Sequence, residues 1–136
     1  MRQTFNKEER LKSRKLIQQL FAEGKSLNAF PIRLLYLPSD HDSPYRIQAG
    51  VTVSKRNFKK AVQRNRIKRL LREAYRKNKR ILYDELADKH RSIIFSLIYI
   101  GNEEETYPLI EKKIIAALHR LISEIAKNPQ QNTPVS

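Results

Sequence analysis

The residues of this sequence that could carry out chemistry are cations, and nearly half of them lie in one stretch. Between residues 55 and 80 there are 13 Lys or Arg side chains and a single acid, Glu73, which gives the stretch a net charge of +12. The whole chain of 136 residues has a net charge of +14, so the rest of it is nearly neutral. A concentrated positive charge on a small domain favours a polyanionic partner such as a nucleic acid. The chemistry that the sequence predicts is therefore binding to phosphates.

The residue types that would support catalysis or metal binding are scarce. Because the chain has no Cys, it has no disulfide, no thiolate nucleophile and no Cys-ligated metal, and a reducing cytoplasmic location is favoured. The three histidines, His41, His90 and His119, are far apart, and no spacing of acids and histidines matches a catalytic motif. We therefore expect that the protein itself neither catalyses a reaction nor binds a metal or cofactor.

The basic stretch is expected to position its cations on a helix from about residue 61 to residue 79. At 100° per residue, the cations and Asn65 lie opposite an apolar stripe. That stripe consists of Ile67, Leu70, Leu71, Ala74 and Tyr75. Like charges one turn apart destabilise an isolated helix by roughly 0.2 to 0.5 kcal/mol per pair. A basic run is often only a solvated face, but this one is so lopsided that an anionic partner is expected to offset the repulsion.

A strand from Tyr45 to Ser54 is a second candidate surface. Apolar residues alternate there with small or polar ones, as in a half-buried strand; the apolar positions are Ile47, Ala49, Val51 and Val53. Gly50 would leave a gap in the polar face where the backbone of a ligand could approach. A solvated sheet face fits the same pattern, so both interpretations stay open.

The remaining elements are expected to form the scaffold. Ser13 can cap a helix at 14–23, which would end at Gly24 in a left-handed conformation. The patterns also predict a strand at 30–37, a surface loop at 38–44, a buried strand at 91–100, a last helix that begins near Thr106 or Tyr107, and a disordered tail at 128–136. The longest apolar run is far too short to cross a bilayer, and the opening residues have no apolar segment of a secretory signal.

This order of elements predicts the fold class. Helix, strand, strand, helix, strand and helix suggest an α/β two-layer sandwich, with helices packed on a small sheet, in one domain over residues 1–127. If the strands at 45–54 and 91–100 are parallel, the basic helix connects them in a βαβ unit. A right-handed crossover would be the default for such a unit.

The basic helix and the strand before it carry a family resemblance. The segments Gly50-Val51-Thr52-Val53-Ser54-Lys55 and Ala61-Val62-Gln63-Arg64-Asn65-Arg66-Ile67-Lys68-Arg69-Leu70-Leu71-Arg72-Glu73 resemble the protein subunit of bacterial ribonuclease P. Arg10-Leu11, Leu20-Phe21 and Gly24-Lys25-Ser26 accompany them, and the resemblance covers about residues 5 to 125.

The resemblance implies a fold and an activity. The fold would be an α+β sandwich of a roughly four-stranded sheet and three helices, like the second domain of the fifth protein of the small ribosomal subunit. It would have a left-handed βαβ crossover, against the default, and a further short strand that the sequence pattern does not place. In that family an RNA with bound magnesium cleaves precursor tRNA at its 5′ end, and the small basic protein, in a 1:1 assembly, holds the RNA and the 5′ leader.

The same resemblance implies the roles of individual residues. The residues expected to contact the ribonuclease P RNA are Arg64, Asn65, Arg66, Lys68, Arg69 and Arg72. The residues expected to form a cleft for the single-stranded leader are Phe21, Thr52, Ser54, Lys55 and Lys12. Ile17 occupies a position that is commonly Phe in the family, and an aliphatic side chain can pack against a leader but cannot stack on a base.

Two other classes of nucleic-acid-binding protein share some of these features. A ribosomal protein or RNA chaperone would also combine a small α/β domain with a basic helix, and co-purification with ribosomal subunits would identify it. A helix-turn-helix protein that binds DNA is disfavoured, because strands flank the basic helix and no short helix precedes it across a tight turn. No partner in a membrane is expected.

Overall fold

The structure is a computed structural model, and it describes residues 9–38, 47–86 and 92–127. The predicted tail at 128–136 and the predicted loop at 38–44, apart from Pro38, lie outside the described residues. Within the described part, no helix is both long enough and apolar enough to cross a membrane.

A four-stranded mixed sheet forms the centre of the fold. Its strands are β1 (Lys25–Ala29), β2 (Ile32–Pro38), β3 (Ile47–Val53) and β4 (Ile93–Tyr99), and their order in space is β1-β2-β4-β3. β2 pairs antiparallel with both β1 and β4, whereas β3 pairs parallel with β4. The predicted strands at 45–54 and 91–100 are thus confirmed as adjacent parallel strands. The handedness of their crossover stays a prediction.

The strand that the sequence pattern did not place is β1. Only Leu27 of its five residues is buried, so its sequence lacks the apolar alternation that reveals a strand. The predicted strand at 30–37 begins two residues later than expected, because Phe30 and Pro31, joined by a cis peptide bond, form the turn between β1 and β2.

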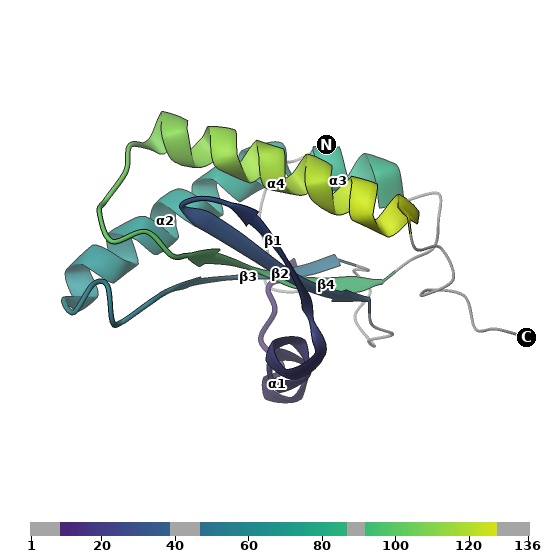
Figure 1. Cartoon of the computed structure of the whole chain (residues 1–136), viewed down its shortest axis with the longest axis horizontal. Coiled ribbons are helices and arrows are strands. Elements are labelled where there is room, and N and C mark those ends of the chain that lie inside the picture. Colours follow the sequence, from purple (N-terminus) through teal and green to yellow (C-terminus); the bar gives the residue numbers. More distant parts are fainter. Residues whose placement is uncertain (1–8, 39–46, 87–91, 128–136) are drawn as a thin grey trace, which may run out of the picture.

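The described residues form four helices beside this sheet, one more than the three expected. They are α1 (Arg14–Glu23), α2 (Ala61–Asn78), α3 (Arg80–Leu86) and α4 (Tyr107–Lys127). Figure 1 shows α2, α3 and α4 on one face of the sheet and α1 alone on the other. The additional helix, α3, is separated from α2 only by Lys79, so that in the sequence the two helices read as one.

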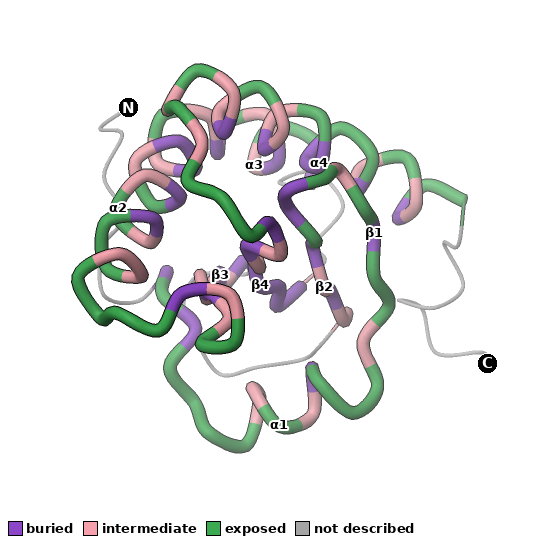
Figure 2. Tube along the Cα trace, turned by 60° about the vertical axis from the view of Figure 1, so that its left-hand side comes forward, coloured by how far each residue is buried: buried purple, intermediate pink, exposed green. Residues whose placement is uncertain are grey.

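Apolar side chains fill both faces of the sheet. The main core lies between the sheet and α2 and α4, and a smaller cluster of Leu11, Leu20 and Ile94 lies under α1. β4 contributes to both clusters and is buried along almost its whole length (Figure 2), which explains why its sequence is apolar at every position except Ser96. Within the predicted stripe of α2, Ile67, Leu71, Ala74 and Tyr75 are buried.

The ends of α1 confirm one prediction and correct another. Ser13 caps the helix, since its Oγ accepts a hydrogen bond from the Leu16 amide at 3.2 Å. Gly24, however, is extended (φ −69°, ψ 157°) and not left-handed. A Cβ at this position would lie 2.4 Å from the carbonyl oxygen of Leu20. Glycine is therefore required there for space and not for its conformational freedom.

Candidate nucleic-acid interface

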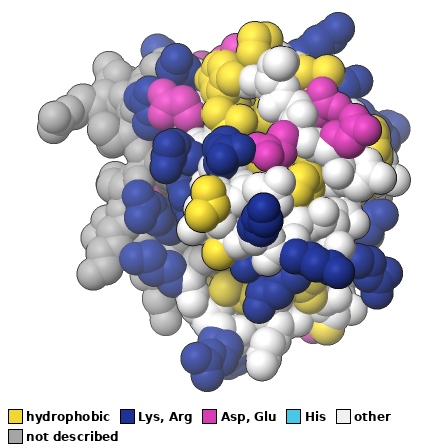
Figure 3. Space-filling view, turned by 90° about the vertical axis from the view of Figure 1, so that its left-hand side faces the viewer, with side chains coloured by type: hydrophobic (Ala, Val, Ile, Leu, Met, Phe, Trp, Pro, Cys, Tyr) yellow, Lys and Arg dark blue, Asp and Glu magenta, His cyan; other side chains and the backbone are white. Residues whose placement is uncertain are grey.

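One face of α2 presents the predicted cations to solvent. Asn65, Arg66, Arg69 and Arg72 are exposed, whereas Lys68 is half-buried beside them. These side chains recur over two turns of the helix because its opposite stripe is buried in the main core. Figure 3 shows Lys and Arg side chains gathered over much of the face that includes this end of the molecule, with the acids in a few separate groups. A rigid row of this kind can contact several phosphates at once.

The side chain of Arg64 makes hydrogen bonds within the protein. Its guanidinium Nη1 donates to the carbonyl oxygens of Phe58 at 2.7 Å and of Lys59 at 2.8 Å. Lys60, the N-cap of α2, makes no side-chain capping bond, so Arg64 holds the segment that enters the helix. Phe58 itself is buried against Tyr99 and so supplies an apolar contact in the loop that enters α2. An RNA contact by Arg64 stays a prediction.

Arg66 has an acidic partner from another part of the chain. Its Nη1 lies 2.8 Å and 3.1 Å from the two carboxylate oxygens of Glu104, which precedes α4. The two side chains are 53% and 31% exposed, so the ion pair lies at the surface and can open. Gln63 also reaches the same carboxylate, at 3.5 Å.

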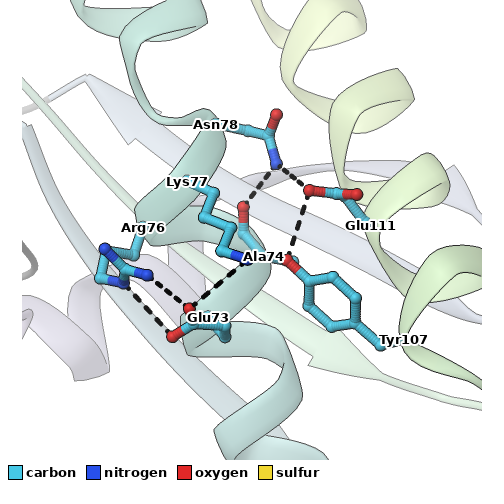
Figure 4. A network of polar contacts seen from close by, with 7 residues as sticks. All are labelled: Glu73, Ala74, Arg76, Lys77, Asn78, Tyr107 and Glu111. Atoms are coloured by element: carbon cyan, nitrogen blue, oxygen red, sulfur yellow. Dashed lines mark hydrogen bonds and ion pairs between the residues drawn. The ribbon is translucent and has the colours of Figure 1, made fainter. Parts of the chain in front are cut away.

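The C-terminal end of α2 binds to α4 (Figure 4). The Asn78 amide donates to the Ala74 carbonyl at 2.8 Å and to Glu111 at 3.0 Å, and the Tyr107 hydroxyl donates to the same carboxylate at 3.3 Å. Glu73, the one acid of the basic stretch, pairs with Arg76, whose hydrogen bond lowers the pKa of Glu73. These contacts engage Glu73, Arg76 and Asn78 within the protein. The exposed cations Arg69 and Arg72 lie before them, in the middle of α2.

A cleft lies between α1 and the outer side of the sheet. A pocket of about 170 Å³ contains Phe21 and Ile17 of α1, Thr52 and Gly50 of β3, and Ser96 of β4. The side chain of Phe21 is 55% exposed, so it is not a core residue. Gly50 and Ser96 are paired across the sheet on the side of α1. Sequence reasoning missed Ser96, although a lone hydroxyl in an apolar run was a usable signal.

A second pocket of about 270 Å³ joins the first. The two share Leu11, Gly50 and Val51, and the second also contains the cations Arg10, Lys12 and Arg72. Residues 9–13, which precede α1 and are here called the arm, form its outer wall. The Leu11 amide donates a hydrogen bond to the Ala49 carbonyl at 2.9 Å, and Arg10 pairs with Ala49 in a short parallel bridge. Arg10 thus joins the candidate site, and Arg72 connects the cleft to the basic helix.

The predicted cleft residues are therefore only partly brought together. Phe21 and Thr52 line the first pocket and Lys12 the second, but Ser54 and Lys55 line neither. The Ser54 hydroxyl accepts a hydrogen bond from the Arg56 amide at 3.2 Å and so closes the turn after β3. Lys55 is exposed in that turn.

The described residues show no arrangement for metal binding. No three His, Cys, Asp or Glu side chains between residues 9–38, 47–86 and 92–127 are grouped to hold an ion. His119 is exposed on α4, and the other two histidines lie outside the described residues. What these residues can do chemically is bind an anionic polymer along α2 and an extended segment in the adjoining cleft.

Known proteins resemble this chain in sequence and in fold. Residues 5–122 match the sequence model of a family described as Ribonuclease P. The chain is 34% identical over 128 residues to a ribonuclease P protein component of Porphyromonas gingivalis, covering 93% of each chain. It is 33% identical over 135 residues to that of Chlorobium phaeobacteroides, covering 90% of this chain and 91% of the relative.

Two solved structures resemble the fold. The RNase P protein of Thermotoga maritima matches with a TM-score of 0.63 and 26% identity, over 82% of this chain and 96% of that one. The RNase P protein of Staphylococcus aureus matches with a TM-score of 0.64 and 22% identity, over 85% of this chain and 96% of that one. The second likeness concerns the fold alone.

Proposed function

The chain belongs to the ribonuclease P protein family, and from this we propose how its surface is divided between two RNA ligands. It is the protein subunit of ribonuclease P, a ribonucleoprotein endoribonuclease of tRNA processing, and its partner is the ribonuclease P RNA. The exposed face of α2 binds that RNA, through Asn65, Arg66, Arg69 and Arg72. The cleft between α1 and β3 binds the single-stranded 5′ leader of precursor tRNA.

The continuity of the two pockets carries this proposal. Arg72 belongs to the basic face of α2 and also lines the second pocket, which has Leu11, Gly50 and Val51 in common with the pocket of Phe21 and Thr52. An RNA on α2 and a strand in the cleft would therefore lie next to each other on one surface. This is the arrangement that a protein needs if it presents a substrate to a catalytic RNA.

The chemistry of the cleft suits an extended single strand. The exposed ring of Phe21 offers a stacking platform of the kind that is worth about 1 to 3 kcal/mol per base. Lys12, Arg10 and Arg72 supply positive charge for the phosphates that follow. Ile17 lies in the same pocket and offers apolar contact without stacking, so one aromatic platform serves the leader here.

The wider assembly follows from the same proposal. One protein binds one ribonuclease P RNA in the cytoplasm, and magnesium is held at the active site of the RNA. Cleavage of precursor tRNA then needs the RNA, as the family resemblance implies.

The test separates the two surfaces with one variant each. Arg69→Ala should weaken binding of the ribonuclease P RNA and reduce the slope of log K against log salt by about 0.7 to 0.9, the value of one phosphate contact. Phe21→Ala should weaken binding of precursor tRNA to the holoenzyme by about 5- to 150-fold and leave mature tRNA unchanged. Lys112→Ala, which removes an exposed cation on α4, is the control. Equal losses for both tRNAs would place the leader elsewhere.

A further inference from the structure

A buried ion pair lies at the junction of α2 and α3. The side chains of Glu9 and Lys79 are only 3% and 2% exposed, and the Lys79 ammonium donates to both carboxylate oxygens at 2.7 Å and 2.9 Å. The Tyr83 hydroxyl donates to the same carboxylate. Burial raises the pKa of Tyr83, so the phenol stays protonated and can donate at any ordinary pH. The charged groups are thus paired and hydrogen-bonded, as buried charges have to be.

Stability alone does not explain such a pair. A buried ion pair can often be replaced by apolar residues of similar volume without loss of stability, because desolvation of the charges offsets their attraction. What a buried pair can supply is a fixed register between two segments. Here it connects segments that are 70 residues apart in the sequence.

One side of the pair is rigid. Lys79 lies between α2 and α3, and its carbonyl oxygen accepts hydrogen bonds from the amides of Leu82 and Tyr83, each at 3.0 Å. Both donors to Glu9, the Lys79 ammonium and the Tyr83 hydroxyl, therefore come from one turn of folded backbone. This turn therefore fixes the position of the Glu9 carboxylate.

The other residue of the pair, Glu9, belongs to the arm, which forms a wall of the cleft. Glu9 is followed directly by Arg10, Leu11 and Lys12, which line the second pocket, and Leu11 bonds to the free edge of β3 through Ala49. The Leu11 side chain also packs with Leu20 and Ile94 under α1, so Leu11 holds one point of the arm and Glu9 holds another. The position of Glu9 therefore sets how closely Arg10 and Lys12 approach Arg72.

We propose that Glu9, Lys79 and Tyr83 are positioning residues for leader binding: their buried contact places Arg10 and Lys12 against Arg72, so that the three cations can contact consecutive phosphates of a single strand. This inference rests on the proposed leader cleft. It adds that the cleft is assembled from a distance, by residues that do not touch the RNA.

The main test replaces the pair while keeping the core filled. The double variant Glu9→Met/Lys79→Met should fold and bind the ribonuclease P RNA as the wild type does, because α2 is unchanged. Its holoenzyme should bind precursor tRNA at least fivefold more weakly, with unchanged affinity for mature tRNA. The salt slope for precursor tRNA should fall by up to about 1.4, the value of two single-strand phosphate contacts. Glu124→Met/Lys127→Met, which removes an exposed ion pair on α4, should have no effect.

A second measurement follows the arm directly. Amide hydrogen exchange at Leu11 should become at least tenfold faster in the double variant, relative to the amides of β4. Tyr83→Phe, which removes one donor and keeps the ion pair, should change exchange and leader binding in the same direction but less, and it serves if the double variant does not fold. Unchanged leader binding in a folded variant, or unchanged exchange at Leu11, would overturn the proposal. A wild-type holoenzyme that does not distinguish precursor from mature tRNA would instead refute the leader cleft itself.

Discussion

Glu104→Gln should make the protein bind the ribonuclease P RNA more tightly. In the protein alone, the Glu104 carboxylate holds the Arg66 guanidinium at 2.8 Å and 3.1 Å. If Arg66 contacts a phosphate, its ion pair with Glu104 has to open first. The free energy of that ion pair is then lost from the free energy of RNA binding. An amide at position 104 keeps the size of the side chain and removes the competing charge.

The expected gain follows from the exposure of the pair. Its side chains are 53% and 31% exposed, and ion pairs of this kind are worth about 0.2 to 1 kcal/mol. Release of that free energy corresponds to an affinity gain of about 1.4- to 5-fold. The substitution also raises the net charge by one, which by itself strengthens binding to any polyanion at low salt.

The assay therefore compares two variants with the same change in charge. Glu103→Gln removes an exposed acid for which the described residues offer no cation within 4 Å, so it reports the general effect of charge. Binding to the ribonuclease P RNA is measured at about 0.15 M salt, where exposed charges farther apart than about 8 Å are largely screened. Glu104→Gln should exceed Glu103→Gln, and the excess should vanish in an Arg66→Ala background. Equal gains in the two variants, or an excess that survives without Arg66, would refute the reasoning.

Three further predictions concern the scaffold of the site. Arg64→Ala should lower the free energy of unfolding by about 1.5 kcal/mol, because two carbonyls lose a charged donor. Arg69→Ala should change the free energy of unfolding by less than about 0.5 kcal/mol. Urea denaturation of the two variants measures both changes. Gly24→Ala should destabilise by about 1 to 3 kcal/mol, since its Cβ would crowd a backbone oxygen, and should lower the urea midpoint. Burial and the nearby Glu105 carboxylate raise the pKa of Tyr99 to about 12, while an unfolded Tyr ionises near pH 10. The folded state therefore retains the proton longer, and stability that is complete below about pH 10 should be lost as the pH rises toward 12; Tyr99→Phe should flatten that decline in urea unfolding series, and an equally steep decline would contradict it.

The sequence by itself determined the elements whose patterns are local. The basic helix α2 and the central strand β4 were predicted to within two residues at each end, because the positions of their apolar residues follow directly from the geometry of a helix or a buried strand. The charge of the α2 stretch likewise indicated a polyanionic partner without any knowledge of the fold. The motif around Arg64 to Arg72 was specific enough to indicate the family, which the comparisons then established.

Elements whose formation depends on a neighbour were not predictable in this way. β1 is a strand because it pairs with β2, since its own sequence has one buried residue. The short helix α3 is separated from α2 only by Lys79, whose side chain is directed to the arm.

The tertiary structure alone decided which cations are available to RNA. Arg64 and Arg66 are almost adjacent in the sequence, yet one binds carbonyls of the entering loop and the other an acid 38 residues away. Glu9 is buried for a similar reason, because folding brings Lys79 to it across 70 residues. A sequence pattern records which side of an element a residue occupies, but the partner of a charged side chain is set by distances in space, and these exist only after the elements have packed.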